Sequence, residues 1–354
     1  MRRHPSPTQS AKGYTGERMG VDEDTLLRLT DLTVDFASHE GIVHAVDKVS
    51  FSVAPGELVG LVGESGCGKS VTANAILGLT RMVNNATISG TIEFLGRDLV
   101  AMPESEVRDI RGKDIAMIFQ DPVTSLNPVL SIERLMTEGL EVHLGLSHGD
   151  AVKRSIELLH LVGIPKAAGR IKDYPHQFSG GMRQRVMIAI ALSCNPKLLL
   201  ADEPTTALDV TIQAQILRLM KQLSREYHAA VIVITHDLGV VAGMCERILV
   251  MYAGRIAESG SAKALFGHPH HPYTVGLLRS VPRLNEPRKD SLQTIAGLPP
   301  DLAHLPPGCS FAPRCWLATE ECWQKVPELL ATDAGRLSAC FHAGKLIAGA
   351  EMPA

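Results

Sequence analysis

Residues 63–70 read GESGCGKS, and this stretch decides the fold. It matches the pattern G-x-x-x-x-G-K-S, follows the apolar run Leu58–Val62 and precedes helix-forming residues up to Leu79. This context predicts a buried strand, a glycine-rich loop and a helix, in which backbone N–H groups and the helix N-terminus hold phosphates. The loop consists of Gly63, Glu64, Ser65, Gly66, Cys67, Gly68, Lys69 and Ser70. We expect Lys69 to neutralise phosphate oxygens and the Ser70 hydroxyl to ligate Mg²⁺.

Two further apolar runs end in polar residues that suit nucleotide hydrolysis. Leu198–Ala201 is followed by Asp202 and Glu203, and a second run is followed by His236. Parallel strands of one sheet bring their carboxyl ends to the same edge, so these side chains should meet beside the phosphate loop. We expect Asp202 to serve Mg²⁺ and Glu203 to orient and deprotonate the attacking water. His236 is expected to act at the same edge.

Gln120 ends another short strand, where the sequence becomes helical. Its neutral amide can contact Mg²⁺ or the waters around it, because an amide offers both donors and an acceptor. At that junction it is also placed to respond to a partner that contacts the helical segment. We therefore include Gln120 among the catalytic and Mg²⁺-binding candidates.

The residues FSGGMRQ at 178–184 predict a second helix start that suits an anion. Ser179 can cap this helix, while Gly180 and Gly181 leave backbone N–H groups open to a ligand. One triphosphate does not need two such cradles from a single chain. We therefore expect the second cradle to close on the γ-phosphate that another subunit holds, so that ATP joins two ATPase chains into a dimer.

The order of elements predicts an α/β fold with a mostly parallel P-loop (RecA-like) sheet. Residues 26–96 alternate as strands and turns, which indicates an antiparallel β subdomain. Residues 121–178 indicate an inserted helical lobe, in which Asp150 can cap a helix. Prolines become frequent after about residue 260, which indicates an irregular C-terminal extension. The expected division is a disordered polar arm (1–23), an ATPase domain (24–260) and the extension (261–354).

Composition excludes several classes of protein. The 354 residues carry a formal net charge of −3, with both signs spread along the chain, so nucleic acid is a poor candidate ligand. The longest apolar runs, such as Val186–Cys194, reach about half of the roughly 18 to 20 residues that cross a bilayer. The first two dozen residues lack the apolar core of a secretory signal. Seven cysteines without an export signal indicate reducing cytosol rather than a disulfide framework.

Taken together, the motifs resemble the ABC ATPase family in identity, order and approximate spacing over about residues 26–260. The resemblance implies that Ser179, Gly180 and Gly181 form the signature motif. It implies that Ala207–Asp209 form the D-loop, with Asp209 at the nucleotide interface, and that His236 senses the γ-phosphate.

Two departures from the family pattern affect the expected site. Met182 stands where many members carry Gln, which leaves the Ser and Gly donors intact. The aromatic residue that usually stacks on adenine is best matched by Phe36. A few extra residues before Ala45 leave His39 and His44 as competitors for that position.

The C-terminal extension resembles that of the oligopeptide and dipeptide importer ATPases, through the run HPHHPYT at 268–274 and a tail with four cysteines. These cysteines are spaced C-x5-C-x6-C-x17-C and are Cys309, Cys315, Cys322 and Cys340. The spacing lacks the C-x2-C pair of ordinary zinc fingers, so it leaves a metal site and free thiols both open. The resemblance implies a [4Fe-4S] cluster, ahead of zinc, which would add folding energy to a core-poor segment.

As a whole, the resemblance implies an ATP-hydrolysing importer subunit at the cytoplasmic face of the plasma (inner) membrane. The implied cargo is di- and oligopeptides, with nickel, opines or other small solutes as alternatives. The implied partners are a homologous second ATPase chain in a heterodimer, two transmembrane permease subunits docked on the lobe, and indirectly an extracytoplasmic peptide-binding protein. A non-transport ATPase is the remaining alternative, but no coiled-coil heptads fill residues 63–179, as DNA-repair members require.

Overall fold

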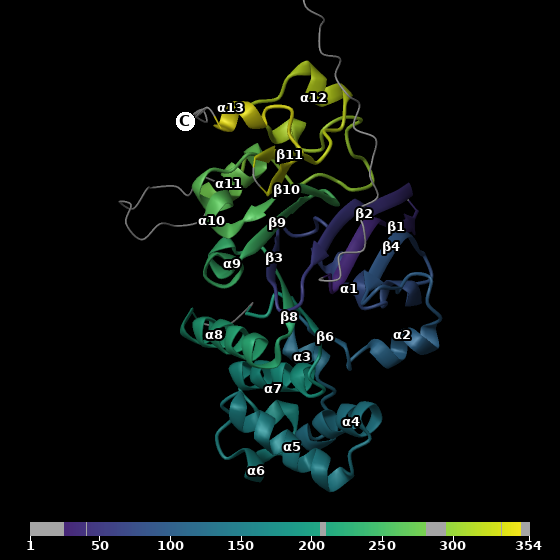
Figure 1. Cartoon of the computed structure of the whole chain (residues 1–354), viewed down its shortest axis with the longest axis vertical. Helices are drawn as coiled ribbons and strands as arrows, with labels where there is room; N and C mark the ends of the chain where they lie inside the picture. The colour runs from purple at the N-terminus through teal and green to yellow at the C-terminus, as the bar shows by residue number, and fades with distance from the viewer. Residues whose placement is uncertain (1–24, 40, 206–209, 281–294, 334, 348–354) are drawn as a thin grey trace, which may run out of the picture.

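The computed structural model describes residues 25–39, 41–205, 210–280, 295–333 and 335–347. Its main sheet has the strand order β11-β12-β10-β9-β3-β8-β7-β6 (Figure 1). The strands from β9 to β6 pair in parallel. In sheet order they are β9 (Arg247–Tyr252), β3 (Leu58–Val62), β8 (Ala230–Thr235), β7 (Leu198–Asp202) and β6 (Ile115–Ile118). The predicted mostly parallel α/β core is confirmed.

These strands supply side chains to two hydrophobic cores, one on each face of the sheet. In β7, Leu199 and Ala201 enter one core, while Leu198 and Leu200 enter the other. Successive side chains of a strand point to opposite faces, and burial on both faces explains why the strands are continuously apolar. The first core is covered by α7 (Gly180–Leu192), α8 (Val210–Tyr227) and α9 (Leu238–Met244). The second is covered by α1 (Lys69–Ile76) and the β subdomain.

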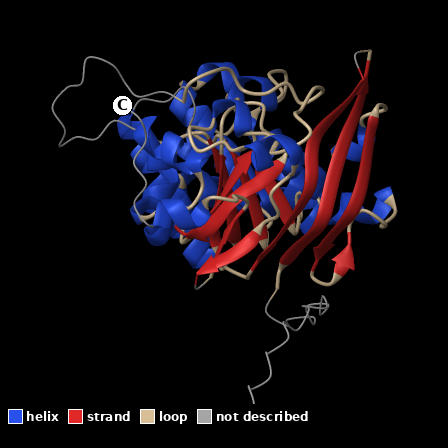
Figure 2. Ribbon diagram, turned by 90° about the horizontal axis from the view of Figure 1, so that it is seen from above, coloured by secondary structure: helices blue, strands red, loops and turns tan. Residues whose placement is uncertain are grey.

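The β subdomain is an antiparallel sheet in the order β2-β1-β4-β5, whose long strands stand out at the side of the molecule in Figure 2. Its strands are β1 (Leu27–Ser38), β2 (Gly41–Val53), β4 (Ala86–Phe94) and β5 (Arg97–Asp98). A single turn, η1 (Thr80–Met82), precedes β4, and α2 (Glu104–Ile110) follows β5. Buried residues such as Leu29 and Ile92 join this sheet to the second core, so the subdomain and α1 form one packed unit.

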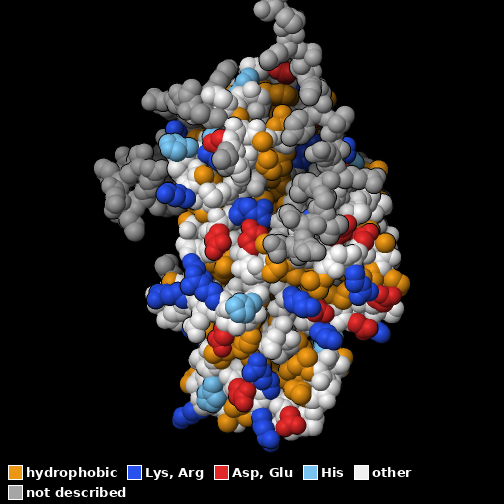
Figure 3. All heavy atoms as spheres, in the orientation of Figure 1, with side chains coloured by type: hydrophobic (Ala, Val, Ile, Leu, Met, Phe, Trp, Pro, Cys, Tyr) orange, Lys and Arg blue, Asp and Glu red, His pale blue; other side chains and the backbone are white. Residues whose placement is uncertain are grey.

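The predicted helical lobe lies at the lower end of the molecule in Figure 1. It contains α3 (Pro122–Ser125), α4 (Ile132–Leu144), α5 (His148–Leu161), α6 (Ala167–Arg170) and the turn η2 (Pro175–Gln177). The expected cap of α5 was wrong: its N-cap is Ser147, whose hydroxyl accepts the Asp150 N–H at 3.3 Å. On the face shown in Figure 3, charges of both signs are interspersed over the lobe.

The C-terminal extension is less irregular than its prolines suggested. Its strands β12 (Arg336–Ser338) and β11 (Leu330–Asp333) continue the main sheet from β10 (Arg255–Ser261), with Glu258 opposite Ser338. The pairing is reinforced by the buried ion pair between Arg336 and Glu258 at 3.4 Å. The remaining elements are α10 (Ala262–Gly267), α11 (Pro272–Ser280), η3 (Ala312–Arg314), α12 (Glu320–Gln324) and α13 (Ala343–Ile347). No helix in the described part of the chain is long and apolar enough to span a membrane.

Candidate nucleotide site

The predicted phosphate loop joins β3 to α1 and is tightly packed. Gly68 is the N-cap of α1 and has a φ of 105°. A Cβ at Gly68 would lie 2.2 Å from the carbonyl oxygen of Ala45, so only glycine allows this backbone path. Next to Ala45, the N–H of Gly254 donates to the carbonyl of Cys67 at 3.0 Å. The loop therefore packs against both β2 and the β9–β10 turn, which are themselves bonded through Asp47 N–H and the Gly254 carbonyl at 2.8 Å.

Lys69 is 5% exposed, and its ammonium group lies over the first part of the loop. Its Nζ donates to the carbonyls of Gly63 at 2.9 Å and Glu64 at 2.8 Å. These bonds place a positive charge at the loop, where phosphate oxygens would bind. Burial raises the pKa of the neighbouring Cys67 thiol, against the opposing effect of Lys69, so this cysteine stays protonated at neutral pH.

The structure brings Ser70 and Asp202 together at the ends of two different elements. The Ser70 hydroxyl donates to Asp202 Oδ1 at 3.0 Å, although the residues are 132 positions apart. Burial raises the pKa of Asp202, while the Ser70 hydrogen bond acts in the opposite direction. A bound cation would favour the carboxylate form here, because a nearby positive charge lowers a carboxyl pKa. A hydroxyl and a carboxylate are ligands that suit Mg²⁺.

Glu203 follows directly and connects the two other predicted catalytic side chains. Its Oε2 accepts from Gln120 Nε2 at 2.9 Å, and its Oε1 lies 2.9 Å from His236 Nδ1. Its backbone has a φ of 45°, held by the N–H bond to Ile234 at 2.8 Å. A left-handed conformation costs a residue with a Cβ about 1 kcal/mol or more, and such strain concentrates at functional sites. The two side-chain contacts and the backbone hydrogen bond together fix the orientation of the Glu203 carboxylate.

The second helix start is found as expected at the N-terminus of α7. Ser179 is its N-cap, and its hydroxyl accepts the Met182 N–H at 3.4 Å. Ser179 and Gly180 are exposed, so their polar groups are open to a ligand from outside the chain. One turn further, Gln184 is buried and donates to the carbonyl of Pro204 at 2.7 Å, next to Glu203. This bond, which the sequence did not indicate, joins the helix to the carboxylate segment.

Phe36 lines a pocket of about 470 Å³ together with Gln120 and Asp202. His44, one of its competitors for adenine, is instead paired with Asp35 at 2.8 Å. His39 is exposed on the β1–β2 hairpin. The predicted D-loop, including Asp209, lies outside the described residues.

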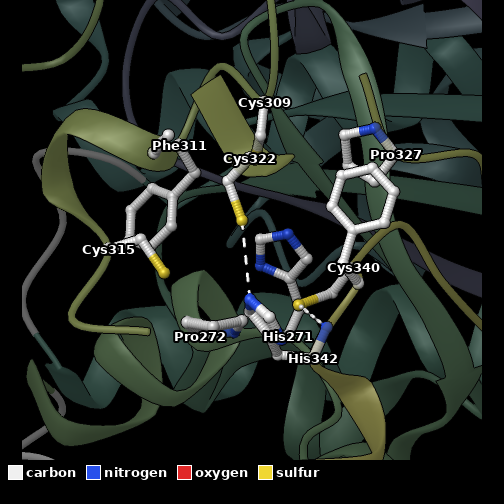
Figure 4. A pocket seen from close by; sticks show the side chains of 11 residues that line it. His271, Pro272, Cys309, Phe311, Cys315, Cys322, Pro327, Cys340 and His342 are labelled. Atoms are coloured by element: carbon white, nitrogen blue, oxygen red, sulfur yellow. Dashed lines mark hydrogen bonds between the residues drawn. The ribbon is translucent and has the colours of Figure 1, made fainter. Parts of the chain in front are cut away.

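The four tail cysteines come from separate segments and line one pocket, which Figure 4 shows from close by. Burial raises the pKa of Cys309, that of Cys315 to about 11 and that of Cys340 to about 12. His342 lies between two of them: its Nε2 is 3.6 Å from Cys322 Sγ, and its N–H donates to Cys340 Sγ at 3.3 Å. Among the residues that the structure describes, no three His, Cys, Asp or Glu side chains are placed to hold a metal ion. The expected iron–sulfur site is therefore not shown.

Two residues of the extension contact the phosphate loop and were not predicted. Tyr273 is fully buried on α11, and its hydroxyl accepts the Glu64 N–H at 2.7 Å. Arg314 forms a two-pronged ion pair with the Glu64 carboxylate, at 2.7 and 3.0 Å. These contacts join positions 209 and 250 residues apart, and no motif spacing could have indicated them.

The geometry defines an ATP-binding cassette: a phosphate loop with a strained carboxylate beside it, and a second glycine-rich helix start turned outward. A model of the ABC transporter family matches residues 46–206, and a model of the oligopeptide/dipeptide transporter C-terminal region matches residues 257–322. A dimeric structure of a post-hydrolysis state of the ATP-binding cassette MJ0796, bound to ADP and Pi, is 30% identical with a TM-score of 0.60. It covers 67% of this chain and 98% of that chain.

Curated relatives match over nearly the whole length. The oligopeptide transport ATP-binding protein OppD of Salmonella typhimurium is 52% identical over 318 residues, which are 90% of this chain and 94% of that protein. The oligopeptide transport ATP-binding protein AppD of Bacillus subtilis is 49% identical, over 90% of this chain and 96% of that protein. The chain belongs to the ABC transporter family, as one of its ATP-binding proteins.

Proposed function

We propose that this chain hydrolyses ATP to drive the uptake of di- and oligopeptides through separate permease subunits. The observation that carries the ATPase step is the convergence of Gln120, Glu203 and His236 beside the phosphate loop. Glu203 accepts a proton from the attacking water, and Gln120 and His236 hold its carboxylate in position. His236 also contacts the γ-phosphate once ATP is bound. The residues that would hold Mg²⁺ are Ser70, Asp202 and Gln120; the ion neutralises phosphate charge when it is bound.

The active site is completed by a second ATPase chain. Ser179 and Gly180 are exposed and Gly181 is half-buried, and their N–H and hydroxyl groups at a helix start suit the γ-phosphate of a partner's nucleotide. Asp209 would lie at the same interface, and Phe36 would stack on adenine within this chain. The related cassette MJ0796 is described as dimeric with ADP and Pi. We propose that the partner is a homologous chain, which would make the pair a heterodimer.

Replacing Ser179 by Ala is expected to leave ATP binding by the chain alone unchanged and to lower hydrolysis by the assembled transporter about tenfold or more. The reason is that the lost hydroxyl acts only on the nucleotide held by the partner, where a preorganised donor contributes strongly. Single-turnover hydrolysis at the partner's site measures this. Ser147→Ala is the matched control, since it removes an N-cap of similar geometry from α5. Equal losses in the two variants would reduce Ser179 to a helix cap.

The permease would dock in a groove between the sheet and the helical lobe. This groove has a volume of about 260 Å³. Its lining is largely apolar and includes Leu77, Met117, Phe119, Leu135, Met136 and Ile190. Leu79, Met117 and Phe119 line both this groove and the pocket that contains Gln120, so a helix seated in the groove would contact the active site through these shared side chains. A permease docked there would hold the chain at the cytoplasmic face of the inner membrane.

Peptides are the proposed cargo because residues 257–322 match the oligopeptide/dipeptide transporter C-terminal region, and the relatives are called oligopeptide transport proteins. We take residues 24–260 as the catalytic domain and 261–354 as the group-specific extension. The test is uptake of a labelled tripeptide and of nickel by cells that lack this chain. Loss of tripeptide uptake alone supports the proposal, whereas loss of nickel uptake alone would assign the transporter to the other cargo.

We further propose that the four tail cysteines hold a metal centre, with [4Fe-4S] preferred to zinc. The donor set fits: four thiols line one pocket, and burial keeps Cys309, Cys315 and Cys340 from ionising unless a cation compensates. Binding requires the side chains to turn toward a common centre. When bound, the centre would supply folding energy that this proline-rich segment lacks.

Anaerobic purification of the full chain is expected to give about four iron and four sulfide per chain, as a Cys₄-ligated cube requires. Cys340→Ser should lose most of this iron, while Cys194→Ser should keep it, because Cys194 is a buried cysteine of the body, away from the pocket. Iron, sulfide and zinc analyses provide the measurement. Stoichiometric zinc without iron would replace the cluster by a single ion, and the absence of both metals would end the proposal.

A further inference from the structure

Glu64, the second residue of the phosphate loop, is held by the C-terminal extension, by Lys69 and by the N–H of Cys67, which donates to its carbonyl at 3.4 Å. Its N–H donates to the buried Tyr273 hydroxyl at 2.7 Å. Its carboxylate takes both prongs of the Arg314 guanidinium, at 2.7 and 3.0 Å. Its carbonyl accepts from Lys69 Nζ at 2.8 Å. Backbone donor, backbone acceptor and side chain of one loop residue are therefore all occupied, two of them by the extension.

Arg314 is itself rigidly placed. Its side chain is 5% exposed, and its Nε donates to the carbonyl of Ala296 at 3.0 Å. It lies 6.0 Å from the ring centres of Tyr252 and Phe311, within reach of a cation–π attraction. A bidentate arginine–carboxylate pair is stronger and more directional than a single charged hydrogen bond. Arg314 thus fixes both the position and the orientation of the Glu64 side chain.

We propose that Arg314 is a positioning residue for ATP binding: through Glu64 it sets the loop conformation that places the Lys69 ammonium. The proposal rests on the proposed ATPase function. The effect of Arg314 on Lys69 is indirect. Arg314 holds the Glu64 carboxylate, and the Lys69 ammonium is bonded to the backbone carbonyl of the same residue. Preorganised binding groups lose less free energy on binding, so a loop released from Arg314 should bind nucleotide more weakly.

The same contacts join the nucleotide site to the cysteine-lined pocket. Arg314 immediately precedes Cys315, and Tyr273 follows Pro272, which lines that pocket. Phe311 also lines the pocket and lies 5.5 Å from the Tyr273 ring. A shift of this segment would therefore move Glu64, and by reciprocity nucleotide binding should steady the segment.

The chain contains a matched control for the Arg314–Glu64 pair. The phosphate loop follows the C-terminal end of β3, and the control pair lies at the N-terminal end of that strand. Arg247 forms a bidentate pair with Glu57, at 2.7 and 3.1 Å, just before β3 begins. Both pairs are partly buried and both join distant segments, but Arg247–Glu57 lies at the end of β3 away from the phosphate loop. Loss of either pair should lower the melting temperature, whereas only loss of the Arg314 pair should affect nucleotide binding.

The experiment measures the affinity of the full chain for a fluorescent ATP analogue. Arg314→Gln is expected to raise Kd about tenfold, while Arg247→Gln should leave it within about twofold of wild type. Arg314→Lys keeps the charge, is expected to fold, and should give an intermediate Kd, because lysine supplies one prong instead of two. Glu64→Gln combined with Arg314→Gln should be no worse than either change alone, since both remove the same interaction.

Hydrogen exchange gives a second measurement that a purely structural role would not move. ATP analogue binding should slow amide exchange over residues 309–318 in wild type and in Arg247→Gln, but not in Arg314→Gln. Equal Kd values for wild type, Arg314→Lys and Arg314→Gln would overturn the proposal, as would nucleotide protection of 309–318 that persists without Arg314. A wild-type chain that fails to bind the analogue would instead refute the ATPase function itself.

Discussion

Replacing Glu203 by Gln should lower the rate of ATP hydrolysis by about 10²- to 10⁴-fold while leaving ATP affinity close to wild type. The amide cannot take a proton from water, yet it has nearly the same shape and can still bond Gln120 and His236, which hold the present carboxylate at 2.9 Å each. Binding and chemistry should therefore separate, with the effect in kcat rather than in KM.

The same variant should accumulate the closed ATPase dimer, because ATP holds the two chains together and is no longer consumed. Size-exclusion chromatography with ATP and steady-state hydrolysis are the two measurements. Glu246→Gln, the same change at an exposed position, is the control and should behave as wild type. Hydrolysis by Glu203→Gln within about threefold of wild type would show that the water is activated by a different group.

Replacing Lys69 by Ala should have the opposite pattern and weaken ATP binding by about 10- to 100-fold. That range corresponds to one lost charged hydrogen bond, worth about 1.5 to 3 kcal/mol. Lys69 is the buried cation of the loop, and its removal also frees the carbonyls of Gly63 and Glu64. The substitution therefore removes a cation that would bind the triphosphate and two hydrogen bonds that hold the loop in the absence of nucleotide.

Titration of the full chain with a fluorescent ATP analogue measures this loss, and Lys153→Ala is the control because its side chain is 77% exposed in the helical lobe. Lys69→Arg keeps the charge and should recover part of the affinity. Unchanged affinity in Lys69→Ala would mean that the backbone N–H groups of the loop alone hold the nucleotide.

Much of the fold could be predicted because its signals are local. The parallel strands are short, mostly apolar runs, and four of the five lead directly into residues that the chemistry needs, as Ala201 is followed by Asp202 and Glu203. Since parallel strands share an edge, the order of motifs was enough to predict that Ser70 and Asp202 meet. The helix start at Ser179 was readable for the same reason.

The parts that could not be predicted depend on long-range contacts or on backbone detail. The strands β11 and β12 have only four and three residues and follow a proline-rich stretch, so neither alternation nor length indicated them. The contact of Arg314 with Glu64 spans 250 residues and leaves no pattern in the sequence. The left-handed backbone of Glu203 is set by its neighbours rather than by its own preference.

The continuation of the main sheet into β12 and β11 has a consequence for how the chain can be divided. A protein cut after residue 261 would keep β10 but expose the backbone groups that now pair with β12, leaving an open edge able to pair with strands of other molecules. It would also leave the buried Glu258 carboxylate without the positive charge of Arg336. The extension thus protects the edge of the catalytic sheet, and the first effect of its removal should be aggregation.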